Sequence, residues 1–410
     1  MAARSPVHLS ALVLGALAGC AAPSTPRAAE PARNGTPAAP VAAPEALPSA
    51  APEGEPSENA SPSNGSPAPN TSPAPAPGTE ASDSASAATG AESSPRPPAG
   101  LARGDGGPAD GALAEGDRAY AADDLAAARA AYRRAATIAP KDPAPRVGLA
   151  RVELAETGIA YEYAAAPKDA RLTRLLAELD ATRKLDPDFG PTLLERGRVL
   201  LMLGRKEAAL EALERAVARL PNDPEAHSAR GVALLASGRA NEAFSAFERA
   251  ATLDPGEPDR LRNFAAAGLV LGRVADAISA LRRAARIAPN DARVRGDLGT
   301  AYLAAGYVDN ALAELERAIA LEPQNAAHHS NLAYAALLRR DFARAEREAR
   351  RAIELDATLG SAWINLGIAL ARSGRTDEAE RALMRALALD PEDPRARENL
   401  NELEALRPDR

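Results

Sequence analysis

The chain has 410 residues, with 35 prolines, 29 glycines, one cysteine and a formal net charge of −7 at pH 7. A single cysteine excludes an internal disulfide. A mildly acidic balance, with Arg and Glu intermixed, argues against a nucleic-acid partner. The composition changes sharply near residue 108, which predicts separate regions on either side.

The first region, residues 1–20, reads MAARSPVHLSALVLGALAGC and has the form of a signal peptide. Arg4 precedes an apolar run from Leu9 to Ala18 that is too short to span a bilayer. The small residues before Cys20 resemble the bacterial lipobox, which implies cleavage before Cys20 and lipidation of that cysteine. Ala21 then implies sorting to the outer membrane. The alternative is an ordinary signal peptide with an accidental cysteine.

Residues 21–108 consist mainly of Ala, Pro, Ser, Gly and Glu, and hold more than half of the prolines. Such a segment cannot bury enough apolar surface to offset the entropy of ordering it, so the composition predicts disorder. As a coil, nearly 90 residues span roughly 50 Å. We expect a tether that holds the rest of the chain away from a membrane.

From residue 109 onward, four columns of residues recur with a period of 34, and Pro and Gly are placed as regularly as Ala. The proline column is Pro187, Pro221, Pro255, Pro289, Pro323 and Pro391, with Ala357 at the remaining position. The glycine column is Gly204, Gly238, Gly272, Gly306 and Gly374. The alanine columns are Ala209, Ala243, Ala277, Ala311, Ala345 and Ala379, and Ala216, Ala250, Ala284, Ala318, Ala352 and Ala386.

Each period reads as two helices and a stop, most clearly in Gly360–Asp393. Apolar residues at helical spacing end at Gly374, and a second set ends before Pro391. Thr376 predicts the start of the second helix. Close packing of the two helices requires small side chains, which the alanine columns and several glycines supply. These glycines are Gly197, Gly231, Gly299 and Gly367.

One helix pair cannot bury its own apolar face, so the pairs must stack, and residues 109–393 are predicted to form about eight of them. Residues 394–410 give a polar-backed capping helix and a tail. The regular pairs are Ala109–Asp142, Gly190–Asp223, Pro224–Glu257, Pro258–Asp291, Ala292–Asn325, Ala326–Leu359 and Gly360–Asp393.

The second pair is irregular, because Pro140 and Pro187 are separated by 47 residues instead of 34. The excess falls near residues 156–168, which include Tyr161 and Tyr163. Two interpretations remain open. The segment is either an insertion that binds a partner, as in other repeat proteins, or part of a longer helix pair whose tyrosines pack internally.

The residues of the last period resemble the tetratricopeptide repeat. They match its signature in order: Trp363, Leu366, Gly367, Gly374, Ala379, Leu383, Ala386 and Pro391. The resemblance implies an all-α fold, a right-handed α-solenoid with a concave groove lined by the first helix of each pair. It implies a protein or peptide partner, without naming one.

By the same resemblance, one position of the first helix faces the groove and is occupied by Asn263, Asp297, Asn331 and Asn365. Side chains in register there would hydrogen-bond the backbone of an extended peptide. The alternative is that Asn is common at this position for reasons of folding. Neighbouring groove positions are Arg262, Thr300, Ser330, Tyr334, Ile364 and Ile368.

Catalytic or metal-binding patterns are not evident. His328 and His329 are adjacent, so they point about 100° apart on a helix and make a poor chelate. No phosphate-cradling Gly-rich loop or Ser–His–Asp set has supporting context. We expect no enzyme activity, no cofactor and no metal.

The sequence therefore predicts a non-catalytic adaptor in the bacterial cell envelope, attached to the outer membrane through Cys20 and facing the periplasm. The resemblance to periplasmic repeat lipoproteins implies a partner in an envelope assembly such as a pilus, a secretion secretin or a set of cell-wall enzymes. One alternative is an accessory subunit of an envelope enzyme. Another is a self-assembling structural component that uses exposed leucines, namely Leu235, Leu269, Leu303 and Leu337.

Overall fold

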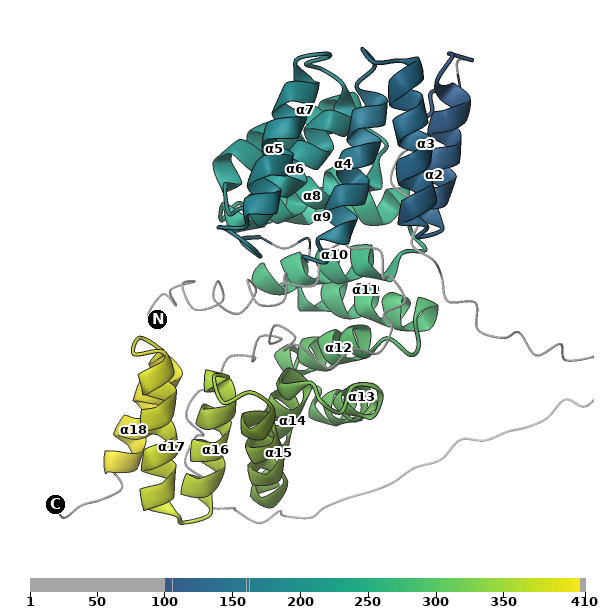
Figure 1. The fold of residues 1–410 in the computed structure, drawn as a ribbon. Helices are drawn as coiled ribbons and strands as arrows, with labels where there is room; N and C mark the ends of the chain where they lie inside the picture. The colour runs from purple at the N-terminus through teal and green to yellow at the C-terminus, as the bar shows by residue number, and fades with distance from the viewer. Residues whose placement is uncertain (1–99, 105, 160, 162, 406–410) are drawn as a thin grey trace, which may run out of the picture. The chain divides into compact units, whose positions relative to one another are not determined.

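The computed structural model describes residues 100–405 except 105, 160 and 162, so Cys20 and residues 21–99 of the predicted tether lie outside the described residues. Within this range the chain forms 17 α-helices and no strand (Figure 1). The expectation of an all-α fold built from helix pairs is confirmed. None of the helices described is both long and apolar enough to cross a membrane.

The helices form eight consecutive pairs followed by α18 (Pro394–Ala405). The first helices are α2 (Asp110–Ala121), α4 (Ala144–Glu156), α6 (Gly190–Met202), α8 (Pro224–Ala236), α10 (Pro258–Val270), α12 (Ala292–Ala304), α14 (Ala326–Leu338) and α16 (Gly360–Arg372). The second helices are α3 (Leu125–Ile138), α5 (Ala170–Arg183), α7 (Lys206–Arg219), α9 (Ala240–Leu253), α11 (Val274–Ile287), α13 (Val308–Leu321), α15 (Phe342–Leu355) and α17 (Thr376–Leu389).

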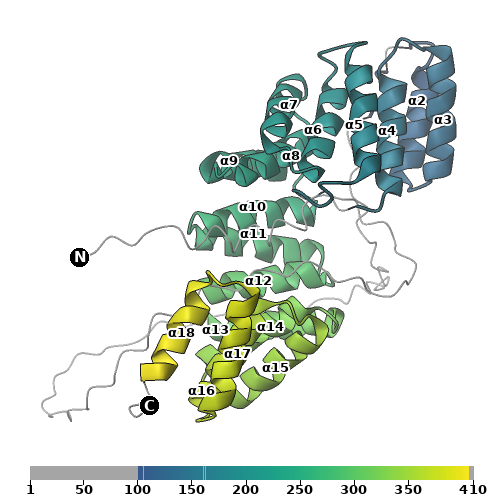
Figure 2. The same cartoon turned by 60° about the vertical axis from the view of Figure 1, so that its left-hand side comes forward.

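Each helix packs against its neighbours in the chain, and each first helix also contacts the first helix of the next pair (Figure 2). Neighbouring second helices of the described part make no comparable contact with one another. The first helices therefore share one side of the stack. The predicted groove residues lie on these first helices.

In five of the eight described pairs, the two helices approach so closely that the crossing point has no room for a side chain on the first helix. A Cβ atom on Gly197 would lie 2.4 Å from Cγ of Leu213, far inside van der Waals contact. The same contact recurs wherever a first-helix glycine meets a large residue 16 positions later. The pairs are Gly116–Tyr132, Gly197–Leu213, Gly231–Phe247, Gly299–Leu315 and Gly367–Leu383.

The turn between the two helices of a pair requires a left-handed backbone. The glycine column has φ angles of 70–77°, a region that glycine enters without strain. Repeat 7 has Arg340 at this position, with φ of 60°. A side chain in this region is strained by roughly 1–2 kcal/mol, so repeat 7 contains a local defect.

The start of α17 differs from the sequence prediction. Thr376 is the first helical residue and does not cap the helix; Arg375 occupies the cap position without a side-chain cap bond. Its guanidinium instead contacts Glu378, at 2.8 Å from Nε to Oε1, and Glu346, at 2.7 Å from NH1. Ala379 is buried in the helix interface, so its identity reports packing. A Thr three residues before it therefore does not indicate a helix cap.

Both ends of the described stack are covered. At the start, Leu101 is buried against the first pairs, and the amides of Leu101 and Ala102 donate to Asp117 Oδ2 at 2.7 and 3.0 Å. At the end, α18 buries Ala396 and Leu403 against the last pair. Covered ends are what an open stack of repeats requires for solubility.

We expect Gly367→Ala to lower the free energy of unfolding by about 1–3 kcal/mol, because its Cβ would lie 2.7 Å from Leu383. Gly360→Ala, in the same helix, is the matched control, since a Cβ there meets no atom within 4 Å. Urea unfolding followed by the fluorescence of Trp363, the single tryptophan, measures both. Equal midpoints for the two variants would contradict the packing argument.

Arg340→Gly should raise the free energy of unfolding by about 1 kcal/mol, because glycine removes the strain at φ of 60°. Arg340→Ala separates this effect from loss of the guanidinium, since alanine keeps the Cβ and the strain. The same urea experiment applies. A gain in both variants would show that charge, and not backbone conformation, is responsible.

Candidate protein-binding groove

The asparagines of the predicted ladder connect successive first helices. Asn365 Nδ2 on α16 donates to the carbonyl of Ser330 on α14 at 2.9 Å, and Asn331 Nδ2 on α14 donates to Thr300 Oγ1 on α12 at 3.1 Å. Ser330 Oγ in turn lies 3.0 Å from Ser361 Oγ on α16. These bonds give the ladder a structural role in stacking; peptide binding by these asparagines stays a prediction.

Repeats 5 and 6 replace this amide contact with an ion pair. Arg262 on α10 donates through Nε to Asp297 Oδ2 on α12 at 2.7 Å, and through NH1 to Asp259 at 2.8 Å. Among the four predicted ladder residues, only Asp297 has a carboxylate. Its ion pair with Arg262 explains why an Asp replaces Asn at this position. Asn263 is buried beside Arg262 on the same helix.

The apolar groove candidates lie near the C-terminal end. Ile364 packs with Ala396 of α18, and the half-buried Ile368 contacts the same cluster. Tyr334 on α14 is largely buried, and burial raises the pKa of its hydroxyl to about 12. The side chains of Ile364 and Tyr334 therefore offer little exposed surface, whereas Thr300 and Ile368 remain half-exposed.

In repeats 2 to 4 the equivalent side of the first helices holds a chain of buried ion pairs. Arg151 Nε on α4 donates to Glu195 Oε1 on α6 at 2.7 Å, and both side chains are at most 3% exposed. Arg198, one turn further along α6, also contacts Glu195 and pairs with Glu225 on α8. Glu195 occupies the ladder position and Arg198 the position of Thr300.

The chain of charges continues to α10. Arg260 NH2 lies 2.5 Å from Glu225 Oε1, and Arg260 NH1 donates to Ser228 at 3.1 Å. Burial alone would raise the pKa of Glu225, but Arg198 and Arg260 together hold it below its usual value. Glu225 is therefore a carboxylate between two guanidinium groups. Removing one member would leave a buried charge unpaired, which typically costs about 3–5 kcal/mol.

The irregular segment after α4 folds back onto α6. The amides of Ala164 and Ala166 donate to the carbonyls of Leu201 and Met202 at 2.9 and 3.1 Å, and Tyr163 Oη donates to the carbonyl of Gly204 at 3.3 Å. These carbonyls lie at the end of α6, where a helix leaves acceptors unpaired. The tyrosines thus pack internally, but the helix pair is not longer, since α4 ends at Glu156.

Tyr161 completes the cover over this part of the groove. Its ring centroid lies 5.2 Å from the guanidinium carbon of Arg198, a cation–π contact. Burial is the first cause that raises the pKa of its hydroxyl well above the usual value. The groove side of repeats 1 to 3 is therefore occupied by side chains of the chain itself.

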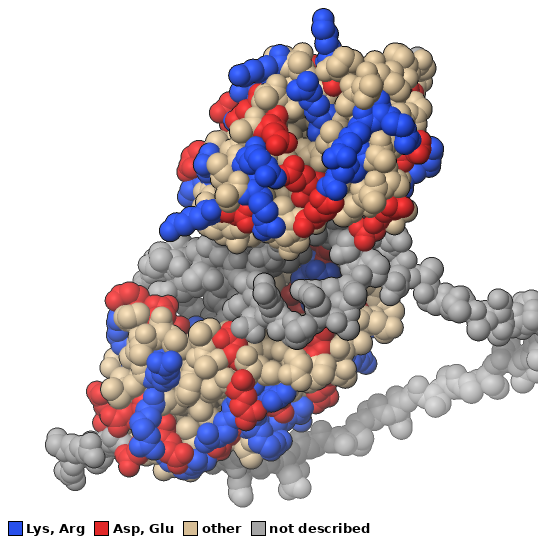
Figure 3. All heavy atoms as spheres, viewed as in Figure 1, with Lys and Arg blue, Asp and Glu red and all other residues tan. Residues whose placement is uncertain are grey.

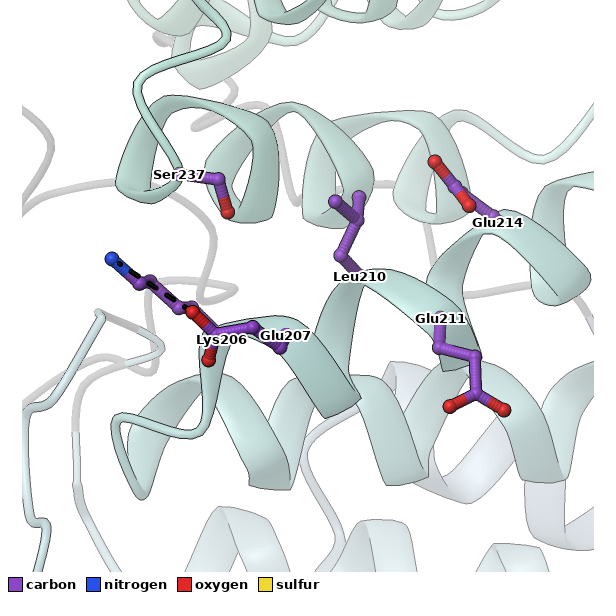
Figure 4. A pocket seen from close by; sticks show the side chains of 6 residues that line it. All are labelled: Lys206, Glu207, Leu210, Glu211, Glu214 and Ser237. Atoms are coloured by element: carbon purple, nitrogen blue, oxygen red, sulfur yellow. Dashed lines mark ion pairs between the residues drawn. The ribbon is translucent and has the colours of Figure 1, made fainter.

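The described residues offer no evident centre for chemistry. No group of three His, Cys, Asp or Glu side chains among them is arranged to hold a metal ion. A shallow pocket on α7 is lined by Lys206, Leu210 and three glutamates, with Ser237 opposite (Figure 4). The Ser237 hydroxyl in this pocket donates to the carbonyl of Ala233 on its own helix, at 2.9 Å.

The charges on the surface are mixed in sign. Lys and Arg side chains alternate with Asp and Glu over the described part of the face in Figure 3. Many form ion pairs between neighbouring repeats, such as Arg344 on α15 with Glu316 on α13 at 2.5 Å. This face therefore lacks the single-sign patch that nucleic-acid binding requires.

Sequence reasoning missed a further member of the ladder. Asn399 on α18 stands 34 residues after Asn365, is half-exposed and donates only to the carbonyl of Arg395 on its own helix, at 2.7 Å. The 34-residue period places Asn399 in the same column as Asn365. The period predicts Asn399 only if the ladder column is continued into the capping helix.

Comparisons with known proteins agree with this geometry. Models of the tetratricopeptide repeat family match residues 194–258, 234–296, 269–333 and 360–403. No curated protein matches the chain.

One solved structure is similar in fold over most of this chain, and two others match part of it. The APC/C hetero-tetramer Cut9–Hcn1 has 16% identity and a TM-score of 0.53, over 72% of this chain and 55% of that one. This chain thus spans about half of that relative. TTC0263, a thermophilic tetratricopeptide repeat protein of Thermus thermophilus, has 26% identity and a TM-score of 0.40, over 44% and 99%. YrrB, with an unusual peptide-binding site, has 18% identity and a TM-score of 0.37, over 46% and 97%.

The family models cover repeats in both halves of the stack, and the same helix-pair arrangement continues on either side of each match. Within the matched residues, 194–333 and 360–403, this chain is therefore built of tetratricopeptide repeats.

Proposed function

We propose that this protein is a non-catalytic adaptor of a bacterial cell envelope. Lipid on Cys20 holds it to the outer membrane, residues 21–108 give it reach into the periplasm, and the first helices of repeats 6 to 8 with α18 bind a protein or peptide. The fold supports the interaction role, since stacked repeats of this kind present extended binding surfaces. The anchor and the location are supported by the sequence alone.

One observation carries the placement of the binding surface. In repeats 2 to 5, the groove positions are occupied by ion pairs and by Tyr161, which leave little for a partner. In repeats 6 and 8, half-buried Thr300 and Ile368 stand at the position that Arg198 has in repeat 3, and half-buried Asn399 of α18 stands at the ladder position. Preorganised helices bind an extended or helical segment with little ordering of the receptor.

The structure gives less support to self-assembly through exposed leucines. Leu235 and Leu303 are buried, and Leu269 and Leu337 are half-buried within apolar clusters, so the expectation that they are exposed is wrong. Both ends of the described stack are also covered. The candidate partners remain a pilus, a secretin or cell-wall enzymes, and the experiments below would name the assembly.

Cys20→Ser should abolish membrane attachment, because no other residue of the chain accepts the lipid in this proposal. Metabolic labelling with a fatty acid, followed by membrane fractionation, measures both steps. Wild type should carry label and sediment with outer membranes, and the variant should do neither. A variant that is still labelled, or still sediments with membranes in high salt, would contradict the lipid anchor.

A photoreactive amino acid at Asn399 or Ile368 should crosslink to one envelope protein in living cells, because both positions lie on the proposed surface. Asn401 is the matched control, since it is exposed on the same helix as Asn399 but about 200° away around its axis. Mass spectrometry identifies the captured protein. Equal capture from positions 399 and 401 would contradict a binding face on the first helices.

A further inference from the structure

Residues 101–104, just before the first repeat, lie against α2 in the manner of a bound peptide. The first two amides of this segment donate to Asp117 Oδ2 at 2.7 and 3.0 Å. The last two donate to Asp110 Oδ1 at 2.7 and 3.2 Å. Two carboxylates of one helix therefore hold four successive main-chain N–H groups. Contacts of this kind give affinity for an extended backbone, whatever its sequence.

Two side chains of the segment add contacts that depend on sequence. Leu101 is 1% exposed and belongs to the same apolar cluster as Tyr132 of α3. Arg103 NH2 donates to Asp142 Oδ1 at 2.8 Å, just before α4, and its guanidinium carbon lies 5.4 Å from the centroid of the Phe189 ring. The segment thus places an apolar side chain in a cluster of the repeats and, two residues later, a cation beside a carboxylate and an aromatic ring.

The residues that receive the segment stand at groove positions. Asp117 has the position in its repeat that Thr300 and Ile368 have in repeats 6 and 8. Leu113, which is buried in the cluster that receives the leucine of the segment, has the position of Ile364. The segment therefore lies on the side of the first helices that carries the surface proposed for the last repeats.

The repeats prepare Asp117 for this contact. Tyr132 Oη donates to Asp117 Oδ1 at 2.9 Å, while Oδ2 accepts the two amides of the segment. Burial, and then the Asp117 carboxylate, raise the pKa of the Tyr132 hydroxyl well above its usual range, so the hydroxyl stays a donor. The charges are complementary, because the repeats supply three carboxylates and the segment supplies the guanidinium and the N–H groups.

Glycines join the segment to the helix that holds it. Gly104 and Gly106 have φ angles of 68° and 73°, and a Cβ atom on either would meet no atom within 4 Å. Glycine moves between backbone regions at little steric cost, and small residues of this kind commonly form hinges. Rotation at this joint can therefore move the segment away from the groove without disturbing α2.

We propose that repeats 1 and 2 form a peptide-binding site, and that residues 101–104 of the same chain fill it as an internal ligand. The site accepts an extended segment with an apolar side chain two residues before an arginine. The internal ligand competes with any other peptide at the effective concentration of a short linker, roughly millimolar. This site is separate from the surface proposed on repeats 6 to 8 and does not depend on it.

Release of the internal ligand changes the connection between the repeats and the predicted tether. While it is bound, the chain is held against α2 from Leu101 onward. Once it is released, the stretch from Leu101 to Asp110 extends to at most roughly 30 Å. A peptide that takes the site therefore lengthens the tether at the same time. This consequence rests on the proposed membrane anchor, whereas the binding site does not.

Binding of the peptide Gly-Leu-Ala-Arg-Gly, the sequence of residues 100–104 with blocked ends, to the full-length chain tests the proposal. Arg103→Glu in the chain turns the contact with Asp142 into a repulsion and so weakens the internal ligand without changing a buried side chain. In an NMR titration, the isotope-labelled peptide should bind this variant at least about tenfold more tightly than wild type, because the internal competitor is lost. Melting followed by circular dichroism reports whether the repeats stay folded.

Asp142→Asn in the Arg103→Glu chain is the matched control on the site. Asparagine keeps an oxygen that can accept from the amide of Ala144, a contact of 3.0 Å, but it carries no charge for the arginine of the peptide. Peptide affinity should therefore fall by about two- to fivefold, the range for a partly exposed ion pair. The same peptide with Leu101→Ser should bind more weakly to the Arg103→Glu chain than the original peptide.

Hydrogen exchange of the wild-type chain gives a reading that needs no variant. The amides of Leu101 and Ala102 should exchange faster as millimolar peptide is added, while those of α8 stay unchanged. No acceleration in wild type, equal peptide affinities of wild type and Arg103→Glu, or no loss with Asp142→Asn would overturn the proposal. A wild-type dimer that Arg103→Glu dissociates would also overturn it, because the segment would then fill the site of a second copy.

Discussion

The architecture depends on one steric constraint, the close approach of the two helices of a pair where they cross, which in five of the eight described pairs leaves no room for a Cβ atom on the first helix. Glycine on the first helix admits Leu213, Phe247 or Leu383 from the second. Where the first helix has Ala333, the facing residue 16 positions later is the small Ala349, so the volume at the crossing is again limited. Because the pair is fixed there, its remaining faces are free to contact neighbouring pairs, and the stack follows.

The groove side of the first helices shows how the same surface serves two purposes. Asn365 and Asn331 use amide hydrogen bonds to hold neighbouring first helices, and Arg151, Glu195, Arg198, Glu225 and Arg260 use buried charges for the same task. A charge that is paired and desolvated inside the stack would leave its partner unpaired if it bound a ligand, which is energetically costly. Neutral, half-buried side chains carry no such penalty, which is why we propose the binding surface among the last repeats.

Much of the fold was predictable from the period of 34, because Pro, Gly and Ala each report a local backbone or packing demand. The roles of the polar residues were not. A column of Asn indicates register but does not say whether the amide meets a neighbouring helix or a peptide. The Arg151–Glu195 pair spans 44 residues, and the irregular segment removes it from the period.

The buried ion pairs also bear on how such a chain grows by gene duplication. A repeat copied from the last three brings its own neutral contacts, so it fits between neighbours much like itself. A copy of repeat 3 would instead set Arg198 opposite a second Pro191, and a copy of repeat 4 would set Glu225 opposite a second Ala226, so each charge would lose its partner in the next repeat. The charged half therefore behaves as one inherited block, while the neutral half is the part in which the number of repeats is free to change.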